Sequence, residues 1–203
     1  MPQISVKEFY ALPLRVHSLL SDVPLRDVWA VDLPRPRTRV TLADFNPFGN
    51  QHRTVSRLPA PARALFDLRF FLGRFLRLEA EPQDADALSF VSRLTSEDRA
   101  RSSAAAGTRS GMFRVIYRFE NEMLLELHNR TVHAATASAL AETADGYRFY
   151  FAVYVANTSW ITPLYMALID PFRRLMIYPA MLKNIRAAWL ATLCHPEAPT
   201  SVL

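Results

Sequence analysis

The sequence predicts an α+β domain in which an antiparallel sheet packs against a long, kinked C-terminal helix. Three observations support this class: apolar and polar residues alternate along most of residues 112–157, a shorter alternating run covers residues 25–33, and apolar residues recur at helical spacing after residue 179. Alternation with a period of two is typical of strands, and steps of three and four are typical of amphipathic helices. The 203 residues, half of them hydrophobic, suffice for one sizeable core, so we expect a single domain over residues 1–203.

The elements that precede the alternating region are of mixed type. LRDVWAVDL (25–33) predicts a strand. Between residues 61 and 77 apolar residues recur at steps of three and four, which predicts a helix. LSFVSRL (88–94) fits either element, and we favour a strand. Residues 100–111 are small, polar and without a period, so they predict a loop.

The alternating region predicts an antiparallel meander with one apolar face. MFRVIYRF (112–119) is the first strand, and a turn centred on Asn121 follows it. Residues 123–140 then form one long strand, or two strands joined at a bend. Residues 144–146, Ala-Asp-Gly, fit a three-residue turn with a glycine bulge, and YRFYFAVYVAN (147–157) is the last strand.

The two turns also predict which way side chains point, because successive residues of a strand face opposite sides. The first turn pairs Tyr117 with Leu125, and the second pairs His133 with Asn157. A single parity then directs a set of polar side chains toward the apolar face: Tyr117, Asn129, Thr131, His133 and Asn157. One bulge would reverse part of this set.

The acidic residues and histidines of the meander suggest neither a carboxylate pair nor a metal site. Glu126 is expected on the outer face beside arginines, and Glu120 and Glu122 are expected to be solvated with it. His128 and His133 are five residues apart, so on one regular strand they face opposite sides. Because the chain has no H-x-x-x-H or clustered cysteine and histidine, we expect no metal site and no cofactor.

The segment TSWITPLYMALIDPFRRLMIYPAMLKNIRAAWLATL predicts a bent helix rather than a membrane span. Asp170, Arg173 and Arg174 would each cost roughly 2.5–3.5 kcal/mol near the centre of a bilayer. Asp170 followed by proline is typical of a helix start, and Pro179 predicts a kink. We expect the helix to lie on the apolar face of the meander, with Arg173 solvated or paired with a carboxylate.

The composition limits the partners and the compartment. The net charge is +5, but the arginines are spread along the chain and mostly alternate with acids, so we expect no nucleic-acid binding. The sequence has no zinc-finger spacing and no glycine-rich phosphate loop. Cys194 is the only cysteine and no signal-peptide pattern opens the chain, so we expect a cytoplasmic protein without an internal disulfide.

Several stretches resemble a bacterial family known as domain of unknown function 2867. They are LRDVWAVDLP, ARALFDLRFFLGRFL, GMFRVIYRFENEMLLELHNRTVHAA, GYRFYFAVYVAN and TPLYMALIDPFRRLMIYP. The family is similar to the helix-grip superfamily (SRPBCC), which includes START lipid-transfer domains and polyketide cyclases. That similarity implies a curved antiparallel sheet wrapped around the C-terminal helix, with a cavity between them. It implies no activity.

The first functional hypothesis is the binding of a small hydrophobic molecule between the sheet and the C-terminal helix. Its ligand-binding residues are drawn from the inward polar set and from the helical segment: Tyr117, Asn129, Thr131, Asn157, Tyr165 and Arg173. The motive is a group of polar side chains on an otherwise apolar sheet, which is the usual composition of a ligand pocket.

Two alternatives stay open. One is an enzyme in the same cavity, a cyclase, dehydratase or isomerase, in which His133 is the general acid or base. Against it, the side chains of Asn129, His133 and Asn157 can form hydrogen bonds with one another and hold the edge of the sheet together. We favour this structural interpretation. The other is a domain with a filled core that binds a protein partner or an anionic membrane surface peripherally. The sequence does not predict the oligomeric state.

Overall fold

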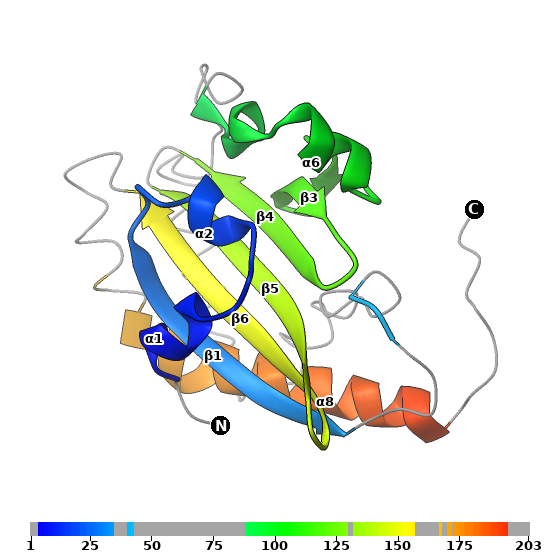
Figure 1. Ribbon diagram of the computed structural model, residues 1–203. Helices are drawn as coiled ribbons and strands as arrows, with labels where there is room; N and C mark the ends of the chain where they lie inside the picture. The colour runs from blue at the N-terminus through cyan, green and yellow to red at the C-terminus, as the bar shows by residue number, and fades with distance from the viewer. Residues whose placement is uncertain are drawn as a thin grey trace.

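A six-stranded antiparallel sheet forms the centre of the protein (Figure 1). The computed structural model describes residues 4–34, 40–42, 88–129, 132–156, 167, 170–171 and 173–194. The strands are β1 Leu25–Pro34, β2 Arg109–Ser110, β3 Phe113–Arg118, β4 Glu122–His128, β5 His133–Thr143 and β6 Gly146–Ala156. Their order in the sheet is β1-β6-β5-β4-β3-β2, so the first strand of the chain pairs with the last. The α+β class and the predicted strand at 25–33 are therefore confirmed.

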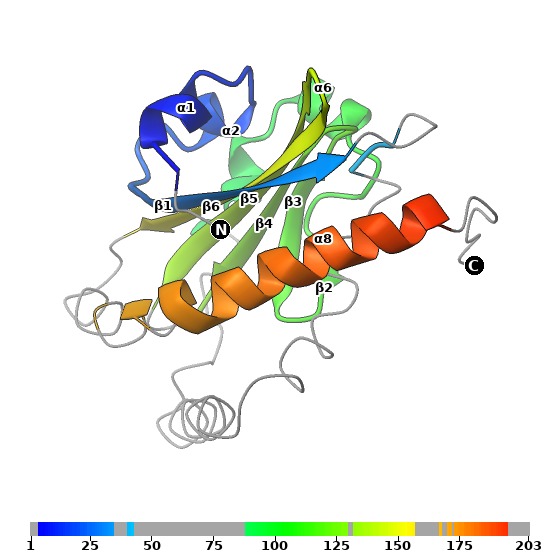
Figure 2. The ribbon, with the colours of Figure 1, turned by 90° about the horizontal axis from the view of Figure 1, so that it is seen from below.

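Helices lie on both faces of the sheet. They are α1 Val6–Tyr10, α2 Val16–Leu19, the 3-10 helix η1 Phe90–Arg93, α6 Ser96–Arg101, the π-helix η2 Arg173–Ile177 and α8 Tyr178–Cys194. Figure 2 shows α8 on one side of the sheet, and α1, α2 and α6 on the other. None of the helices within the described ranges is both long enough and apolar enough to span a membrane.

Both faces of the sheet are buried, whereas the sequence predicted one apolar face and one outer face. On the α8 side, Phe149 and Phe151 of β6 belong to one core cluster. On the other side, Tyr150 and Ala152 of the same strand belong to a second cluster. The sequence of β6, YRFYFAVYV, carries apolar or aromatic residues at both parities, which is typical of a strand covered on both sides.

The small residues of β5 explain how the second face is covered. Three alanines share that face and are almost completely buried: Ala135, Ala137 and Ala139. Their short side chains leave room for large residues of the N-terminal helices and of η1, of which Phe9, Leu19 and Phe90 belong to the same cluster. Interiors pack large against small residues to reach crystal-like density, so these alanines fit a close approach of the helices.

The register of the meander differs from the prediction at two points. In β3, Val115 pairs with Leu125 but Tyr117 pairs with Leu124, so Ile116 is an extra residue in a bulge. The hairpin between β5 and β6 pairs Thr143 with Gly146, which leaves a two-residue loop in place of the predicted three-residue turn. His133 consequently pairs with Ala156 rather than with Asn157.

The segments before the meander also differ from the prediction. Residues 88–94 contain the 3-10 helix η1 and not a strand, because the Ser89 side chain accepts a hydrogen bond from the Val91 amide and caps the turn. Helix α6 was not predicted, although Thr95 and Asp98 form a reciprocal capping box at its start. The helix predicted between residues 61 and 77 lies outside the described residues.

The C-terminal helix lies on the apolar face of the sheet, as predicted. Leu182, Ile185 and Trp189 are buried in the α8-side core, and the Trp189 indole donates a hydrogen bond of 2.7 Å to the Pro34 carbonyl at the end of β1. The predicted kink coincides with the change from the π-helix to α8, next to Pro179. Proline lacks the N–H that an α-helix needs and its ring crowds the carbonyl four residues earlier, so the wider turn suits this position.

Candidate functional sites on the two faces of the sheet

His133 lies on the face opposite α8, within a buried network. Its Nε2 is 2.7 Å from Oε1 of Glu126, which also accepts a hydrogen bond of 2.8 Å from the Phe90 amide. The other carboxylate oxygen accepts a hydrogen bond of 2.5 Å from the Ser89 hydroxyl. The imidazole is stacked between the rings of Phe90 and His128, with 4.1 Å between centroids on each side.

Glu126 is thus a buried acceptor, and the prediction that it lies on a solvated outer face is wrong, although its cross-strand partner is Arg114, one of the arginines expected beside it. The residue is 2% exposed. Burial works against its ionisation, but the hydrogen bonds from His133, Ser89 and the Phe90 amide outweigh burial and lower the pKa of Glu126. Because both oxygens are occupied, the carboxylate holds β4, β5 and η1 together.

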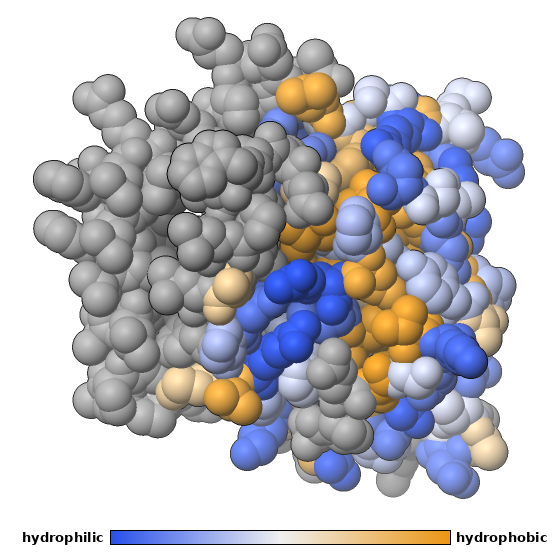
Figure 3. Space-filling view, turned by 90° about the vertical axis from the view of Figure 1, so that its left-hand side faces the viewer, coloured by the Kyte–Doolittle hydropathy of each residue, from blue (hydrophilic) through white to orange (hydrophobic). Residues whose placement is uncertain are grey.

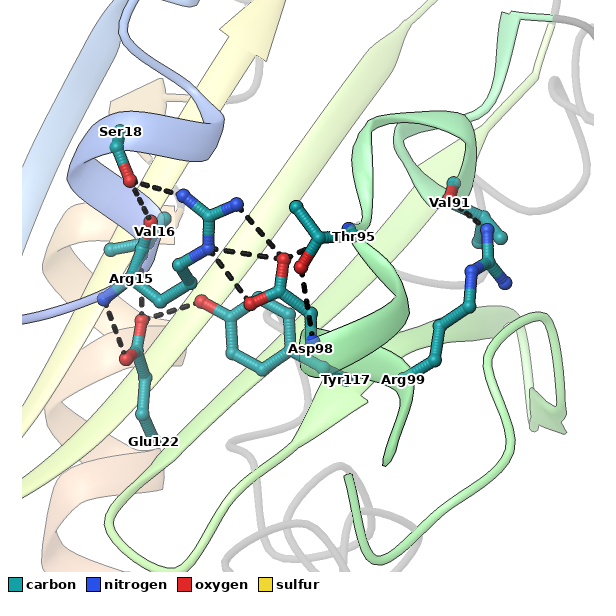
Figure 4. A network of polar contacts seen from close by, with 9 residues as sticks. All are labelled: Arg15, Val16, Ser18, Val91, Thr95, Asp98, Arg99, Tyr117 and Glu122. Atoms are coloured by element: carbon teal, nitrogen blue, oxygen red, sulfur yellow. Dashed lines mark hydrogen bonds and ion pairs between the residues drawn. The ribbon is translucent and has the colours of Figure 1, made fainter. Parts of the chain in front are cut away.

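Tyr117 lies on the same face in a separate network around Glu122 (Figure 4). The Tyr117 hydroxyl donates a hydrogen bond of 2.5 Å to Glu122, whose two oxygens also accept from the Arg15 and Val16 amides at 2.8 Å. Those amides stand at the start of α2, so Glu122 caps that helix from the sheet. Burial, and then the charge of Glu122, raises the pKa of Tyr117. Glu122 is 3% exposed, so its predicted solvation is wrong.

Arg15 extends the Glu122 network to α6. Its guanidinium donates three hydrogen bonds of 2.9–3.1 Å to the carboxylate of Asp98, whose backbone and side chain form the capping box with Thr95. These contacts, led by the hydrogen bonds from Arg15, lower the pKa of Asp98 to about 2. Arg15 therefore links three elements that are distant in sequence: α2, α6 and, through Glu122, β4.

Arg173 lies on the α8 side, where it joins the start of the C-terminal helix to β1. It forms ion pairs with Asp27 at 3.2 Å and with Asp170 at 3.3 Å, and its Nε donates a hydrogen bond of 2.6 Å to the Tyr178 hydroxyl. Pairing with a carboxylate was one of the two predicted outcomes for Arg173, and it is confirmed. We call the side chains of Asp27, Asp170, Arg173, Arg174 and Arg26 the arginine clasp.

The centre of the arginine clasp is a carboxylate with no access to solvent. Asp27 is 0% exposed and accepts from the Trp29 indole at 3.1 Å, while Arg174 lies 3.5 Å away. Burial raises the pKa of Asp27, and the charges of Arg173 and Arg174 oppose that shift. The outer members of the clasp, Arg26 and Arg174, are partly exposed. Figure 3, a view from the left-hand side of Figure 1, shows hydrophilic side chains gathered beside an apolar strip.

The predicted site residues that the structure describes do not come together. Tyr117 and His133 occupy separate networks on the face opposite α8, whereas Arg173 lies on the α8 side. The Asn129 side chain accepts a hydrogen bond of 2.9 Å from the Val132 amide and closes the turn between β4 and β5. Three further predicted residues, Thr131, Asn157 and Tyr165, lie outside the described residues. That these residues bind a ligand stays a prediction.

Two polar atoms that the sequence interpretation missed lie on the α8 side of β5. The hydroxyl oxygens of Thr136 and Ser138 are buried and form no hydrogen bond with any residue that the structure describes, and Ser138 is 1% exposed. Their cross-strand neighbours are Leu125 and Met123 of β4, and Val153 and Phe151 of β6. The signal in the sequence is the run ATASA (134–138), in which two hydroxyl residues share one parity of a strand.

Comparison with known proteins identifies a family but no activity. A family model described as "Protein of unknown function (DUF2867)" matches residues 19–180. A search of curated proteins finds no match. Over the described ranges, the side chains of histidine, cysteine, aspartate and glutamate form no group of three that would hold a metal ion.

Proposed function

The chain belongs to the DUF2867 family, whose description carries no activity, and we propose from its geometry that it binds a small, largely apolar molecule on the α8 side of the sheet. The hydroxyl groups of Thr136 and Ser138 are its polar contacts. They replace the polar set predicted from the sequence, of which Tyr117 and His133 face the other way. A sheet that curves around α8 in the helix-grip manner, with a cavity between them, is part of this proposal.

The observation that carries the proposal is the unsatisfied state of these two hydroxyls. A buried hydroxyl without a hydrogen-bond partner costs about 1–3 kcal/mol, so natural proteins retain few of them. Two on adjacent positions of one strand face call for an explanation beyond packing, because alanine and valine would fill the same places without that cost. A ligand with hydrogen-bonding atoms supplies it.

The surroundings of the hydroxyls define the class of ligand. Residues two apart on a strand face are separated by about 7 Å. All four cross-strand neighbours of Thr136 and Ser138 are apolar. A matching molecule therefore has a hydrophobic body and one or two acceptor oxygens, as in a ketone, an ester or a carboxylic acid.

The same surroundings favour binding over catalysis. General acid–base chemistry needs a titratable side chain within hydrogen-bond reach of the reacting atom. The residues directly opposite Thr136 and Ser138 have none. The histidine of the enzyme alternative, His133, is paired with Glu126 and its side chain is 7% exposed. An apolar molecule on the α8 side would not contact it.

The test is native mass spectrometry of the protein purified from its own host, followed by extraction and identification of any bound molecule. We expect a discrete apolar molecule with the wild-type protein, and its loss from the double variant Ser138→Ala, Thr136→Val. The variant Thr143→Val, at the exposed end of the same strand, is the control and should retain it. A double variant that carries the same molecule at the same occupancy would contradict the proposal, as would a wild-type protein that binds no member of an apolar ketone, ester and fatty-acid panel.

A further inference from the structure

A pocket of about 430 Å³ lies at the end of the sheet near the turn between β3 and β4. Its walls come from the loop 12–14, from residues 40–41, from the end of α6, from the β3–β4 turn and from the neighbouring ends of β5 and β6. Its volume falls within the range of about 300–1,000 Å³ that is usual for small-molecule sites. Neither Thr136 nor Ser138 lines it, so this pocket is separate from the proposed hydrophobic site.

The pocket exists because β5 is longer than its neighbour β4. The pairing between β4 and β5 ends at Glu122 and Ala139, while β5 continues to Thr143. The Leu140 amide still donates a hydrogen bond of 2.9 Å to the Asn121 carbonyl, and the strand then runs on beyond β4. A second backbone bond, from the Leu42 amide to the Glu120 carbonyl at 2.6 Å, holds residues 40–42 against the β3–β4 turn. The walls are therefore tied to the sheet by the backbone.

Arg101 and Glu142 place two opposite charges on the pocket wall. Within the described part of the chain, neither Arg101 nor Glu142 forms an ion pair or a hydrogen bond through its side chain. The guanidinium of Arg101 lies over the ring of Phe119 at 4.4 Å from the centroid, and Phe119 is 1% exposed. A guanidinium that lies over a ring face keeps its N–H groups available for a carboxylate.

The remainder of the pocket is suited to an aliphatic or aromatic side chain. Leu12, Leu14, Val40, Leu140 and Tyr147 contribute apolar and aromatic wall. Tyr147 is itself held edge-on against Trp189 of α8, with 5.6 Å between ring centroids.

We propose that this pocket binds a small zwitterion of the amino-acid type. The ligand carboxylate pairs with Arg101, the ammonium pairs with Glu142, and the side chain lies against Leu140 and Tyr147. A purely anionic ligand fits less well, because Glu120 and Glu142 both line the pocket and would repel it. A purely cationic ligand is opposed by Arg101. A molecule that carries both charges can pair with Arg101 and with Glu142 at the same time.

The test uses the full chain and three matched probes in isothermal titration calorimetry. The probes are L-leucine, 4-methylpentanoate, which lacks the ammonium group, and 3-methylbutylamine, which lacks the carboxylate. We expect L-leucine to bind and each analogue to bind at least about ten-fold more weakly, since each loses one ion pair. A dipeptide, leucyl-leucine, shows whether the natural zwitterion is a free amino acid or a short peptide.

Variants then assign the two charges. We expect Arg101→Gln and Glu142→Gln each to weaken L-leucine binding by about ten-fold, and Arg101→Lys to retain part of it. Arg99→Gln in the same helix and Asp145→Asn in the β5–β6 turn are matched controls and should bind like the wild type. Absence of L-leucine and dipeptide binding, or equal binding of all three probes, would overturn the proposal. Because Ser138→Ala should leave leucine binding unchanged, failure here is distinct from failure of the proposed hydrophobic site.

Discussion

His133 stacks on His128, its direct cross-strand partner, with 4.1 Å between ring centroids and 19° between ring planes. On a single strand two residues five apart would face opposite sides of the sheet. They share a face here because the turn closed by Asn129 separates β4 from β5. The stack places His133 beside Glu126 and away from α8. A ligand bound between the sheet and α8 would therefore not contact the His133 imidazole.

The Glu126 carboxylate is expected to be a major contributor to stability. Glu126→Ala would leave His133, the Ser89 hydroxyl and the Phe90 amide without their acceptor. Leaving a buried donor without its acceptor typically costs about 1–3 kcal/mol, and three donors lose theirs here, so the free energy of unfolding should fall by about 3 kcal/mol or more. Urea denaturation followed by circular dichroism measures this loss.

The matched control for that experiment is Glu142→Ala, since Glu142 is exposed. Its effect on the free energy of unfolding should stay within about 0.5 kcal/mol. If Glu126→Ala were equally mild, Glu126 would not be the anchor between η1 and the sheet that its hydrogen bonds indicate.

Elements with a strong local pattern were predictable from the sequence, and their mutual register was not. The alternation in 25–33 and 147–157 and the apolar stripe of the C-terminal helix predicted β1, β6 and α8 correctly. The bulge at Ile116 has no signal in a run of alternating residues, because both of its neighbours are apolar. Tyr117 faces away from α8 because the β3–β4 hairpin pairs it with Leu124 and not with the predicted Leu125, and the bulge then returns Val115 to the α8 side opposite Leu125.

The candidate sites were less predictable, because their partners are distant in sequence. Glu122 and Glu126 look like solvated acids in ENEMLLELH. Their donors are the Val16 amide at the start of α2 and the Phe90 amide of η1, both far upstream in the chain. Likewise, Arg173 was predictable as a partner of some carboxylate, but pairing with Asp27 depends on where β1 lies in the sheet.

The ion pair between Asp98 and Arg15 predicts a loss of stability in acid. The pKa of Asp98 is lowered from 3.8 to about 2, so the fold binds this proton less readily than the unfolded chain does. Its contribution is fully present above pH 3.8 and is lost as the pH falls toward 2, with a size of about 1–2 kcal/mol. In Asp98→Asn the free energy of unfolding should fall less steeply across this window. Denaturation curves at closely spaced pH values report that slope, and an unchanged slope would contradict the assignment.

Asp27 predicts the opposite pH dependence. Burial raises its pKa above 3.8, so the folded state holds this proton more tightly than the unfolded state. The resulting stabilisation is present below pH 3.8 and is lost as the pH rises through the raised pKa. Removing this titration in Asp27→Asn should make the free energy of unfolding rise more steeply with pH above 3.8, whatever the change in absolute stability. A slope that instead becomes shallower would show that Arg173 and Arg174 dominate over burial.

Removing the unsatisfied hydroxyls on β5 is expected to raise the stability of the ligand-free protein and to weaken ligand binding. In ligand-free protein, Ser138→Ala removes a buried hydroxyl that has no partner, so we expect the free energy of unfolding to rise by about 1 kcal/mol. Thr136→Val should act in the same direction, because valine matches threonine in shape and favours strands. Both variants should lose affinity for the apolar ligand while they gain stability, and thermal unfolding with and without the extracted molecule measures both effects. A purely structural hydroxyl would give the reverse for the ligand-free protein, namely a loss of stability on its removal.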